Sequence, residues 1–172
     1  MYQNILFDLD GTLTNSELGI TNSVAYALEK FGIEVQDKKE LRVFIGPPLK
    51  YSFEHFYGFS EEESLQAVEY YREYFSEKGL YENEVYKGIR EILSSLKQAD
   101  KKLIVATSKP EKFSTQILKH FDLYDYFDFV AGATMDGSRS KKADVIGYAL
   151  EKTKIKNLSE TIMVGDREHD II

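Results

Sequence analysis

The hydrophobic residues of the chain fall into two kinds of pattern. Four short and nearly continuous apolar runs occur at 4–10, 102–108, 127–132 and 161–166, and each run ends in polar residues. Runs of this length and composition are typical of parallel strands that are buried on both faces of a sheet. We therefore expect these four segments to form one parallel sheet.

Around the last three runs, apolar residues instead recur every three to four positions. This spacing predicts helices over 88–100, 110–121 and 142–152. In the first of them, Ile92 and Leu93 belong to the stripe expected to face the core. Strands that alternate with single helices predict an α/β fold with right-handed crossovers.

Residues 15–85 break this alternation. Their apolar positions follow helical spacing, and Ser60 and Glu63 have the spacing of a capping box at the start of a long amphipathic run. We see no convincing strand pattern in this segment. The sequence therefore predicts an all-helical cap domain over 15–85, inserted into an α/β catalytic core made of 1–14 and 86–172.

Composition narrows the function classes. The chain has 172 residues, a net charge of −7 and no cluster of Lys and Arg, so a nucleic-acid polymer is not an expected partner. It has no cysteine, which excludes disulfides and thiolate catalysis and makes a reducing cytoplasm the expected location. No apolar run reaches 18 residues, so we expect no membrane partner either.

Polar side chains gather where the predicted strands end. Ligands of an open parallel sheet bind beyond the carboxyl ends of its strands, so these groups are expected to meet there. Carboxylates so close together need a cation, and oxygen ligands of this kind suit Mg²⁺. The polar residues are Asp8, Asp10, Thr107, Asp166 and Asp170, with Lys141 and Lys142 opening the helix before the last strand.

Four motifs along the chain resemble those of the haloacid dehalogenase superfamily, specifically its phosphatases with a helical cap. They are "DLDGT" (8–12), "LIVATSKP" (103–110), a lysine in "SKKADVI" matched to Lys142, and "GDREHD" (165–170). All four occur in the family's order, and the resemblance spans nearly the whole chain. It implies a Rossmann-like parallel-sheet core with an inserted all-helical cap domain.

The resemblance implies a role for each matched residue. Asp8 would be the nucleophile that forms an aspartyl phosphate, and Asp10 would protonate the leaving alcohol and then activate water. Mg²⁺ would be held by Asp8, the backbone carbonyl of Asp10 and Asp166. Thr107 and Lys142 would bind the transferring phosphoryl group.

Two further expectations concern the end of the chain. Asp170 is expected to orient either a metal-bound water or the lysine, and Lys142 is favoured over Lys141 as that lysine. Relatives usually continue with another helix and strand after the fourth motif, whereas this chain stops at Ile172. We therefore expect the C-terminal end of the core to be missing.

The expected substrate is a small phosphorylated metabolite. "FIGPPL" (44–49) and "YKGIREILSSLK" (86–97) resemble the phosphoglycolate phosphatase and 5'-nucleotidase branch, which implies phosphoglycolate or a nucleoside 5'-monophosphate. Gly46 and Lys50 lie in a Pro-stiffened stretch of the cap. We expect this loop to meet the leaving group of the substrate.

Three other functions share some of these features. A sugar phosphomutase shares the cap and the motifs, so the sequence separates it least well from a phosphatase. A receiver-type signalling module also phosphorylates an aspartate beside Mg²⁺, but its acceptor normally ends a later strand and it has no cap, unlike Asp8 and residues 15–85. A metal-free dehalogenase would gain nothing from a second carboxylate at Asp10.

Overall fold

The structure, a computed structural model that describes residues 2–167 and Asp170, consists of two compact units. The first comprises Met1–Asn15 and Glu84–Ile172, and the second comprises Ser16–Asn83. None of the helices in the described part of the chain has the length and apolar character needed to cross a membrane.

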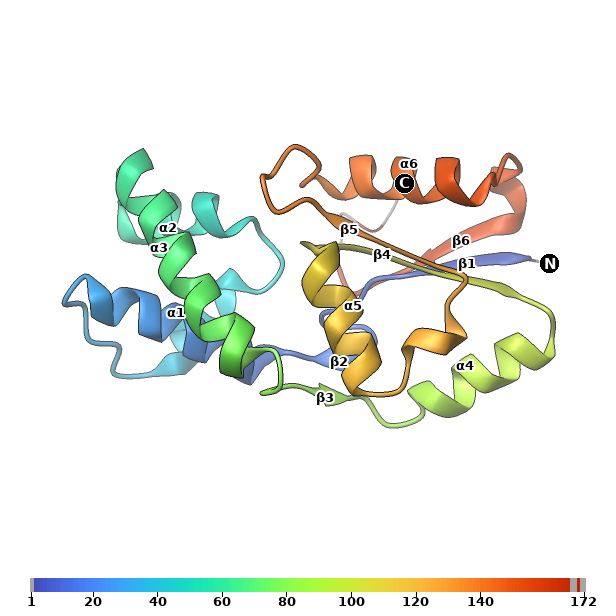
Figure 1. The fold of residues 1–172 in the computed structure, drawn as a ribbon, viewed down its shortest axis with the longest axis horizontal. Helices are drawn as coiled ribbons and strands as arrows, with labels where there is room; N and C mark the ends of the chain where they lie inside the picture. The colour runs from blue at the N-terminus through green and yellow to red at the C-terminus, as the bar shows by residue number, and fades with distance from the viewer. Residues whose placement is uncertain (1, 168–169, 171–172) are drawn as a thin grey trace. The chain divides into compact units, whose positions relative to one another are not determined.

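The first unit is built on a four-stranded parallel sheet, which confirms the α/β prediction (Figure 1). The strand order is β5-β4-β1-β6, so the first strand of the chain lies in the interior of the sheet. Its Ile5 is in register with Leu103 on one side and with Ile162 on the other. The strands are β1 (Asn4–Phe7), β4 (Lys102–Pro110), β5 (Phe129–Ala133) and β6 (Thr161–Val164).

Helices cover both faces of this sheet. In Figure 1, α6 (Lys142–Thr153) lies on one face, and α4 (Ile89–Gln98) and α5 (Glu111–His120) lie on the other. Apolar side chains between α6 and the strands are buried away from water. Their burial is the main contribution that favours folding. This core contains Leu6, Ile104, Ala106, Ala131, Val145, Ile146 and Ala149.

One detail of the predicted helical stripes is wrong. Leu93 is fully buried in α4, whereas Ile92 is 52% exposed. Consecutive residues of a helix are rotated by about 100°, so a narrow contact surface can bury Leu93 and leave the neighbouring Ile92 in solvent. The apolar stripe of α4 is therefore narrower in the structure than in the sequence.

A two-stranded antiparallel ladder was not predicted. It pairs β2 (Thr14–Asn15) with β3 (Glu84–Val85), the residues at which the first unit is interrupted. Each strand has two residues, which is too short for an alternating pattern to be recognised.

Strand β4 carries an irregularity at its carboxyl end. Ala106 pairs with Ala131 and Pro110 with Ala133, so β4 uses four steps where β5 uses two. The extra residues bring the β4 backbone across Gly132, where a Cβ atom would lie 2.7 Å from the Lys109 carbonyl oxygen. Bulges of this kind re-aim side chains next to functional sites.

The second unit is helical. It contains α1 (Glu17–Lys30), a 3₁₀ helix (Lys38–Phe44), α2 (Leu49–Tyr57), α3 (Glu61–Tyr74) and a π-helical turn (Phe75–Gly79). The predicted capping box is confirmed, since the Ser60 hydroxyl accepts from the Glu63 N–H and the Glu63 carboxylate accepts from the Ser60 N–H. The predicted Pro-stiffened loop is shorter than expected, because α2 begins at Leu49 and Lys50 belongs to its first turn.

We predict opposite effects on stability for alanine at two glycines of the first unit. Gly132→Ala should lower the free energy of unfolding by about 1–3 kcal/mol, because its Cβ would lie 2.5 Å from the Glu111 nitrogen. Gly147→Ala should raise it by about 0.5–1 kcal/mol, since Gly147 lies inside α6 with nothing within 4 Å of an added Cβ. Urea unfolding of both variants tests this, and equal effects would contradict the close crossing at Gly132.

Candidate functional site

Asp8 lies directly after β1, at the carboxyl edge of the sheet. Its backbone N–H donates to the Val164 carbonyl at 2.9 Å, and its Oδ1 accepts from the Leu9 N–H at 2.7 Å. The side chain is 11% exposed, and Oδ2 lies 2.8 Å from Lys142 Nζ. Burial raises the pKa of Asp8 above its ordinary value, against the lowering effect of the Lys142 charge and hydrogen bond.

Lys142 is the first residue of α6 and connects two buried carboxylates. Its Nζ lies 2.8 Å from Asp8 Oδ2 and 2.8 Å from Asp170 Oδ1, and it donates to the Ala106 carbonyl at 3.1 Å. Lys141 precedes it and is exposed. The structure thus brings Lys142, and not Lys141, to the carboxylates.

Asp10 is held by a lysine that sequence reasoning missed. Lys109 Nζ lies 2.9 Å from Asp10 Oδ2, and the two side chains are 6% and 15% exposed. The other oxygen, Asp10 Oδ1, is buried and has no hydrogen-bond partner among the described residues. The sequence contained a signal for this contact. Lys109 stands two positions after Thr107, and alternate residues of a strand point to the same face of the sheet.

Thr107 is 1% exposed near the carboxyl end of β4. Its hydroxyl oxygen accepts from the backbone N–H of Lys109 at 3.3 Å. A hydrogen bond from Thr107 also contributes to lowering the pKa of Asp8, against the larger effect of burial. The structure therefore places Thr107 beside Asp8, as well as beside the segment that carries Lys109.

Asp166 and Asp170 complete the group of carboxylates predicted from the sequence. Oxygens of Asp8, Asp166 and Asp170 lie within 4.8 Å of one another. Asp166 is exposed, whereas Asp170 is buried, with Oδ1 at Lys142 and Oδ2 accepting from the Arg167 N–H at 3.1 Å. Both Asp170 oxygens therefore already contact basic or N–H groups of the protein.

Two glycines make room for these carboxylates. A Cβ at Gly11 would lie 2.4 Å from Asp166 Oδ2, and the φ of Gly11 is +82°, a backbone conformation that favours glycine. A Cβ at Gly165 would lie 2.0 Å from Asp170 Oδ2. The glycines of the first and fourth motifs are therefore explained by the space that the carboxylates occupy.

This cluster is chemically suited to Mg²⁺. Each Mg–O bond is about 2.1 Å, so two oxygens on one octahedral ion lie about 3–4 Å apart. The oxygens of the cluster lie within 4.8 Å of one another, which is close to that spacing. The open side of Asp166 leaves room for waters, which Mg²⁺ usually keeps.

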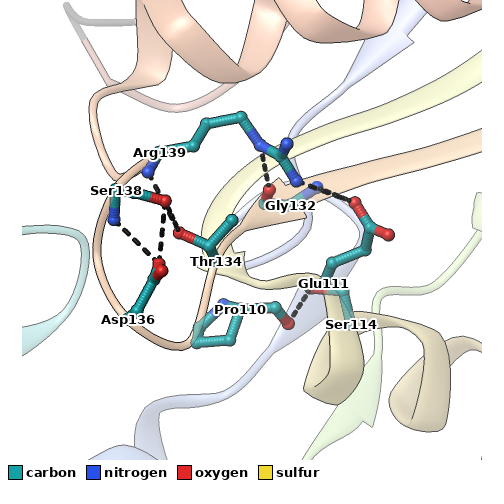
Figure 2. A network of polar contacts seen from close by, with 8 residues as sticks. All are labelled: Pro110, Glu111, Ser114, Gly132, Thr134, Asp136, Ser138 and Arg139. Carbon is teal, nitrogen blue, oxygen red and sulfur yellow. Dashed lines mark hydrogen bonds and ion pairs between the residues drawn. The ribbon is translucent and has the colours of Figure 1, made fainter.

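A polar network fixes the other side of the β4 segment (Figure 2). The Arg139 guanidinium donates to the Gly132 carbonyl at 3.0 Å and to Glu111 Oε2 at 3.2 Å, and its carbon lies 3.6 Å from the centre of the Tyr148 ring. Glu111 Oε2 also accepts from the Gly132 N–H at 3.3 Å. Arg139 therefore links the start of α5, strand β5 and helix α6. Sequence reasoning did not single out these residues.

The loop between β5 and α6 closes on itself in Figure 2. Asp136 Oδ1 accepts from the Ser138 N–H at 3.0 Å and from its hydroxyl at 2.8 Å. Hydrogen bonding by Thr134, followed by that of Ser138, lowers the pKa of Asp136 to about 2. This loop leads into Lys142, so its internal bonds restrain the start of α6.

The two loop residues predicted for substrate contact belong to the second unit. Gly46 has a φ of +103° and is exposed, which favours glycine at this position. Lys50 Nζ lies 2.7 Å from Glu61 Oε1 and 3.7 Å from Glu54 Oε1. All three side chains are solvent-accessible, and ion pairs of this kind are weak enough to exchange for another anion.

Comparisons with known proteins agree with the geometry. A family model described as haloacid dehalogenase-like hydrolase matches residues 5–172. The chain is 44% identical over 171 residues to a 5'-nucleotidase of Pseudomonas aeruginosa, covering 99% of this chain and 77% of that protein.

Two further relatives are a solved structure and a protein named as a kinase. A crystal structure titled as that of a predicted phosphatase from Clostridium acetobutylicum is 54% identical, with a TM-score of 0.95 over 99% of this chain and 79% of that one. The tyrosine-protein kinase PtkA of Mycobacterium tuberculosis is 40% identical over 171 residues. The match covers 98% of this chain but 57% of PtkA.

Proposed function

Since the chain belongs to the haloacid dehalogenase-like hydrolase family and matches relatives named 5'-nucleotidase and predicted phosphatase, we propose that it hydrolyses phosphomonoesters through a phosphorylated Asp8. The phosphatase activity on phosphate esters follows from the family and its relatives. The covalent mechanism, the metal and the substrate are our proposal. The proposal is carried by one observation, the buried Asp8 and the partly buried Asp10, each of which is held by its own lysine.

In the first half-reaction, an oxygen of Asp8 attacks the phosphorus atom. The P–O bond to the ester oxygen breaks, and that oxygen takes a proton from the Asp10 carboxyl group as the alcohol leaves. Lys142 and Thr107 are proposed to bind the transferring phosphoryl oxygens, and the positive charge of Lys142 offsets the charge that develops there.

In the second half-reaction, Asp10 acts as a base. It takes a proton from water, the water oxygen attacks the phosphorus of the aspartyl phosphate, and the bond from phosphorus to the Asp8 oxygen breaks. The products are inorganic phosphate and the original Asp8 carboxylate, with Asp10 again protonated. One carboxyl group thus serves as the acid and then as the base, so it must keep the same orientation through both steps.

Mg²⁺ is the proposed cofactor, held by Asp8, the Asp10 backbone carbonyl and Asp166. Bound Mg²⁺ would offset the negative charge of the phosphoryl oxygens and of the clustered carboxylates. Asp170 is proposed to hold Lys142, because its Oδ1 already contacts the ammonium group.

A nucleoside 5'-monophosphate is the first substrate class to test, because a 44% identical relative is named a 5'-nucleotidase. Phosphoglycolate is the second, from the resemblance of the motifs. The kinase activity named for PtkA is not carried over, since this chain matches 57% of that protein. Release of inorganic phosphate, and not of an isomerised sugar phosphate, distinguishes the phosphatase from a phosphomutase.

Asp8→Asn should abolish turnover, because an amide cannot attack phosphorus. The residual kcat for p-nitrophenyl phosphate should fall below about a hundredth of the wild-type value. Hydroxylamine should trap the wild-type intermediate as a hydroxamate at Asp8, detected by mass spectrometry. Asp144→Asn, an exposed position on α6, is the control. A trapped adduct at another residue would overturn the assignment.

Removal of divalent cations should silence the enzyme reversibly. Chelator should abolish phosphate release, Mg²⁺ should restore it, and Ca²⁺ should restore it poorly because it prefers longer bonds and more ligands.

Asp166→Asn should weaken Mg²⁺ binding by about 10–100-fold in calorimetric titrations without substrate. The control is Asp125→Asn, which changes an exposed carboxylate elsewhere. Unchanged Mg²⁺ affinity in Asp166→Asn would contradict the proposed ligand set.

The second unit is proposed to act as a cap whose Gly46–Lys50 segment contacts the leaving group. Lys50→Ala should lower kcat/KM for adenosine 5'-monophosphate about tenfold, the worth of one hydrogen bond to a charged group. It should change p-nitrophenyl phosphate hydrolysis little, because that leaving group offers no matching contacts. Lys30→Ala, which removes an exposed lysine of the same unit, is the control. An equal change for both substrates would identify the segment as a connector.

A further inference from the structure

We propose that Lys109 is a positioning residue that orients Asp10 so that one particular oxygen, Oδ1, exchanges the proton in both half-reactions. This inference rests on the proposed function, because it assumes that Asp10 is the acid and base of the site. It assigns a role to a lysine of the second motif for which the resemblance implied none.

Asp8 and Asp10 are paired with two different lysines, Lys142 and Lys109. Asp8 and Asp10 are close enough that the charge of Asp10 affects Asp8. Lys142 contacts Asp8 and Asp170, whereas Lys109 contacts Asp10. Because each acidic residue of the first motif has its own lysine, Asp8 and Asp10 can be held in different orientations for different tasks.

The contact also distinguishes the two oxygens of Asp10. Oδ2 accepts from Lys109 at 2.9 Å, while Oδ1 is buried and has no hydrogen-bond partner among the described residues. A protonated carboxyl group has one O–H donor and one carbonyl acceptor. Oδ2 can therefore remain an acceptor toward Lys109 whether Asp10 is protonated or not, which leaves the proton on Oδ1.

The backbone that carries Lys109 is fixed from two directions. The irregular end of β4 passes so close to Gly132 that a Cβ there would clash with the Lys109 carbonyl and with Glu111. In Figure 2, Arg139 contacts the Gly132 carbonyl and Glu111, and Glu111 also accepts from the Gly132 N–H.

The direction of the Lys109 side chain therefore depends on a rigid segment. The backbone N–H of Lys109 also donates to the Thr107 hydroxyl, so the same end of β4 carries the partner of Asp10 and the proposed phosphoryl-binding residue. A long lysine side chain loses about 2 kcal/mol of rotamer entropy when fixed, and it is 6% exposed here. The ion pair compensates both charges and also fixes the direction of the Asp10 carboxylate, so the test needs a readout that charge compensation alone would not change.

The test compares two esters whose leaving groups differ in basicity but little in shape, phenyl phosphate and p-nitrophenyl phosphate. Phenoxide needs a proton far more than nitrophenoxide does. Asp10→Asn should lower kcat for phenyl phosphate about 10²–10³-fold and for p-nitrophenyl phosphate less than about tenfold. Lys109→Met should show the same selectivity, with a loss of about tenfold or more on phenyl phosphate and under about threefold on p-nitrophenyl phosphate.

A double-mutant cycle completes the experiment. In the Asp10→Asn background, Lys109→Met should change kcat for phenyl phosphate by less than about threefold, since it acts through Asp10. Lys109→Arg should restore part of the selectivity, because it keeps a positive charge at Asp10. Lys97→Met, which removes a lysine paired with Asp128 in the same unit, should leave both rates unchanged.

The outcomes separate this inference from the proposed function. Equal losses on both esters for Lys109→Met, or losses that multiply with those of Asp10→Asn, would overturn the positioning role. If Asp10→Asn itself shows no preference between the esters, the acid role of Asp10 fails instead. If Lys109→Met does not fold, as judged by near-UV circular dichroism, Lys109→Ala replaces it with the same expected selectivity, since alanine also removes the donor to Oδ2.

Discussion

The site depends on burying negative charge together with enough positive charge to tolerate it. A buried carboxylate that loses its ion-pair partner costs about 3–5 kcal/mol, so Asp8 and Asp170 need Lys142 and Asp10 needs Lys109. Burial still raises the pKa of Asp8, which means that the ion pair does not fully compensate for desolvation. At this edge of the sheet, the clustered charges therefore reduce the stability of the fold.

Close backbone approach is the second requirement. Gly11 and Gly165 leave space for carboxylates, and Gly132 lets the end of β4 cross over β5. At each position a Cβ atom would lie under 3 Å from a neighbouring atom, nearer than side chains approach in real structures. The carboxylates can lie this close to the backbone only where the neighbouring residue has no Cβ atom, so the charged cluster depends on Gly11 and Gly165.

Much of the fold could be predicted from local pattern. The four parallel strands, the helices around them and the capping box at Ser60 all follow from periodicities of a few residues. The two-residue strands β2 and β3 could not be predicted, since their pairing joins residues about 70 positions apart and neither strand is long enough to show a pattern. Exposure of Ile92 likewise depended on where α4 meets the sheet.

The sequence by itself determined which residues meet at the site. Because the carboxyl ends of parallel strands share one edge, Asp8, Thr107 and Asp166 had to lie near one another once the strands were recognised. Only the tertiary structure decided which partner each group has. Lys142 instead of Lys141 reaches Asp8, and Lys109 reaches Asp10, because the start of α6 and the irregular end of β4 set where those side chains point. Contacts of this kind depend on backbone paths fixed by distant residues such as Gly132 and Arg139, which no local pattern records.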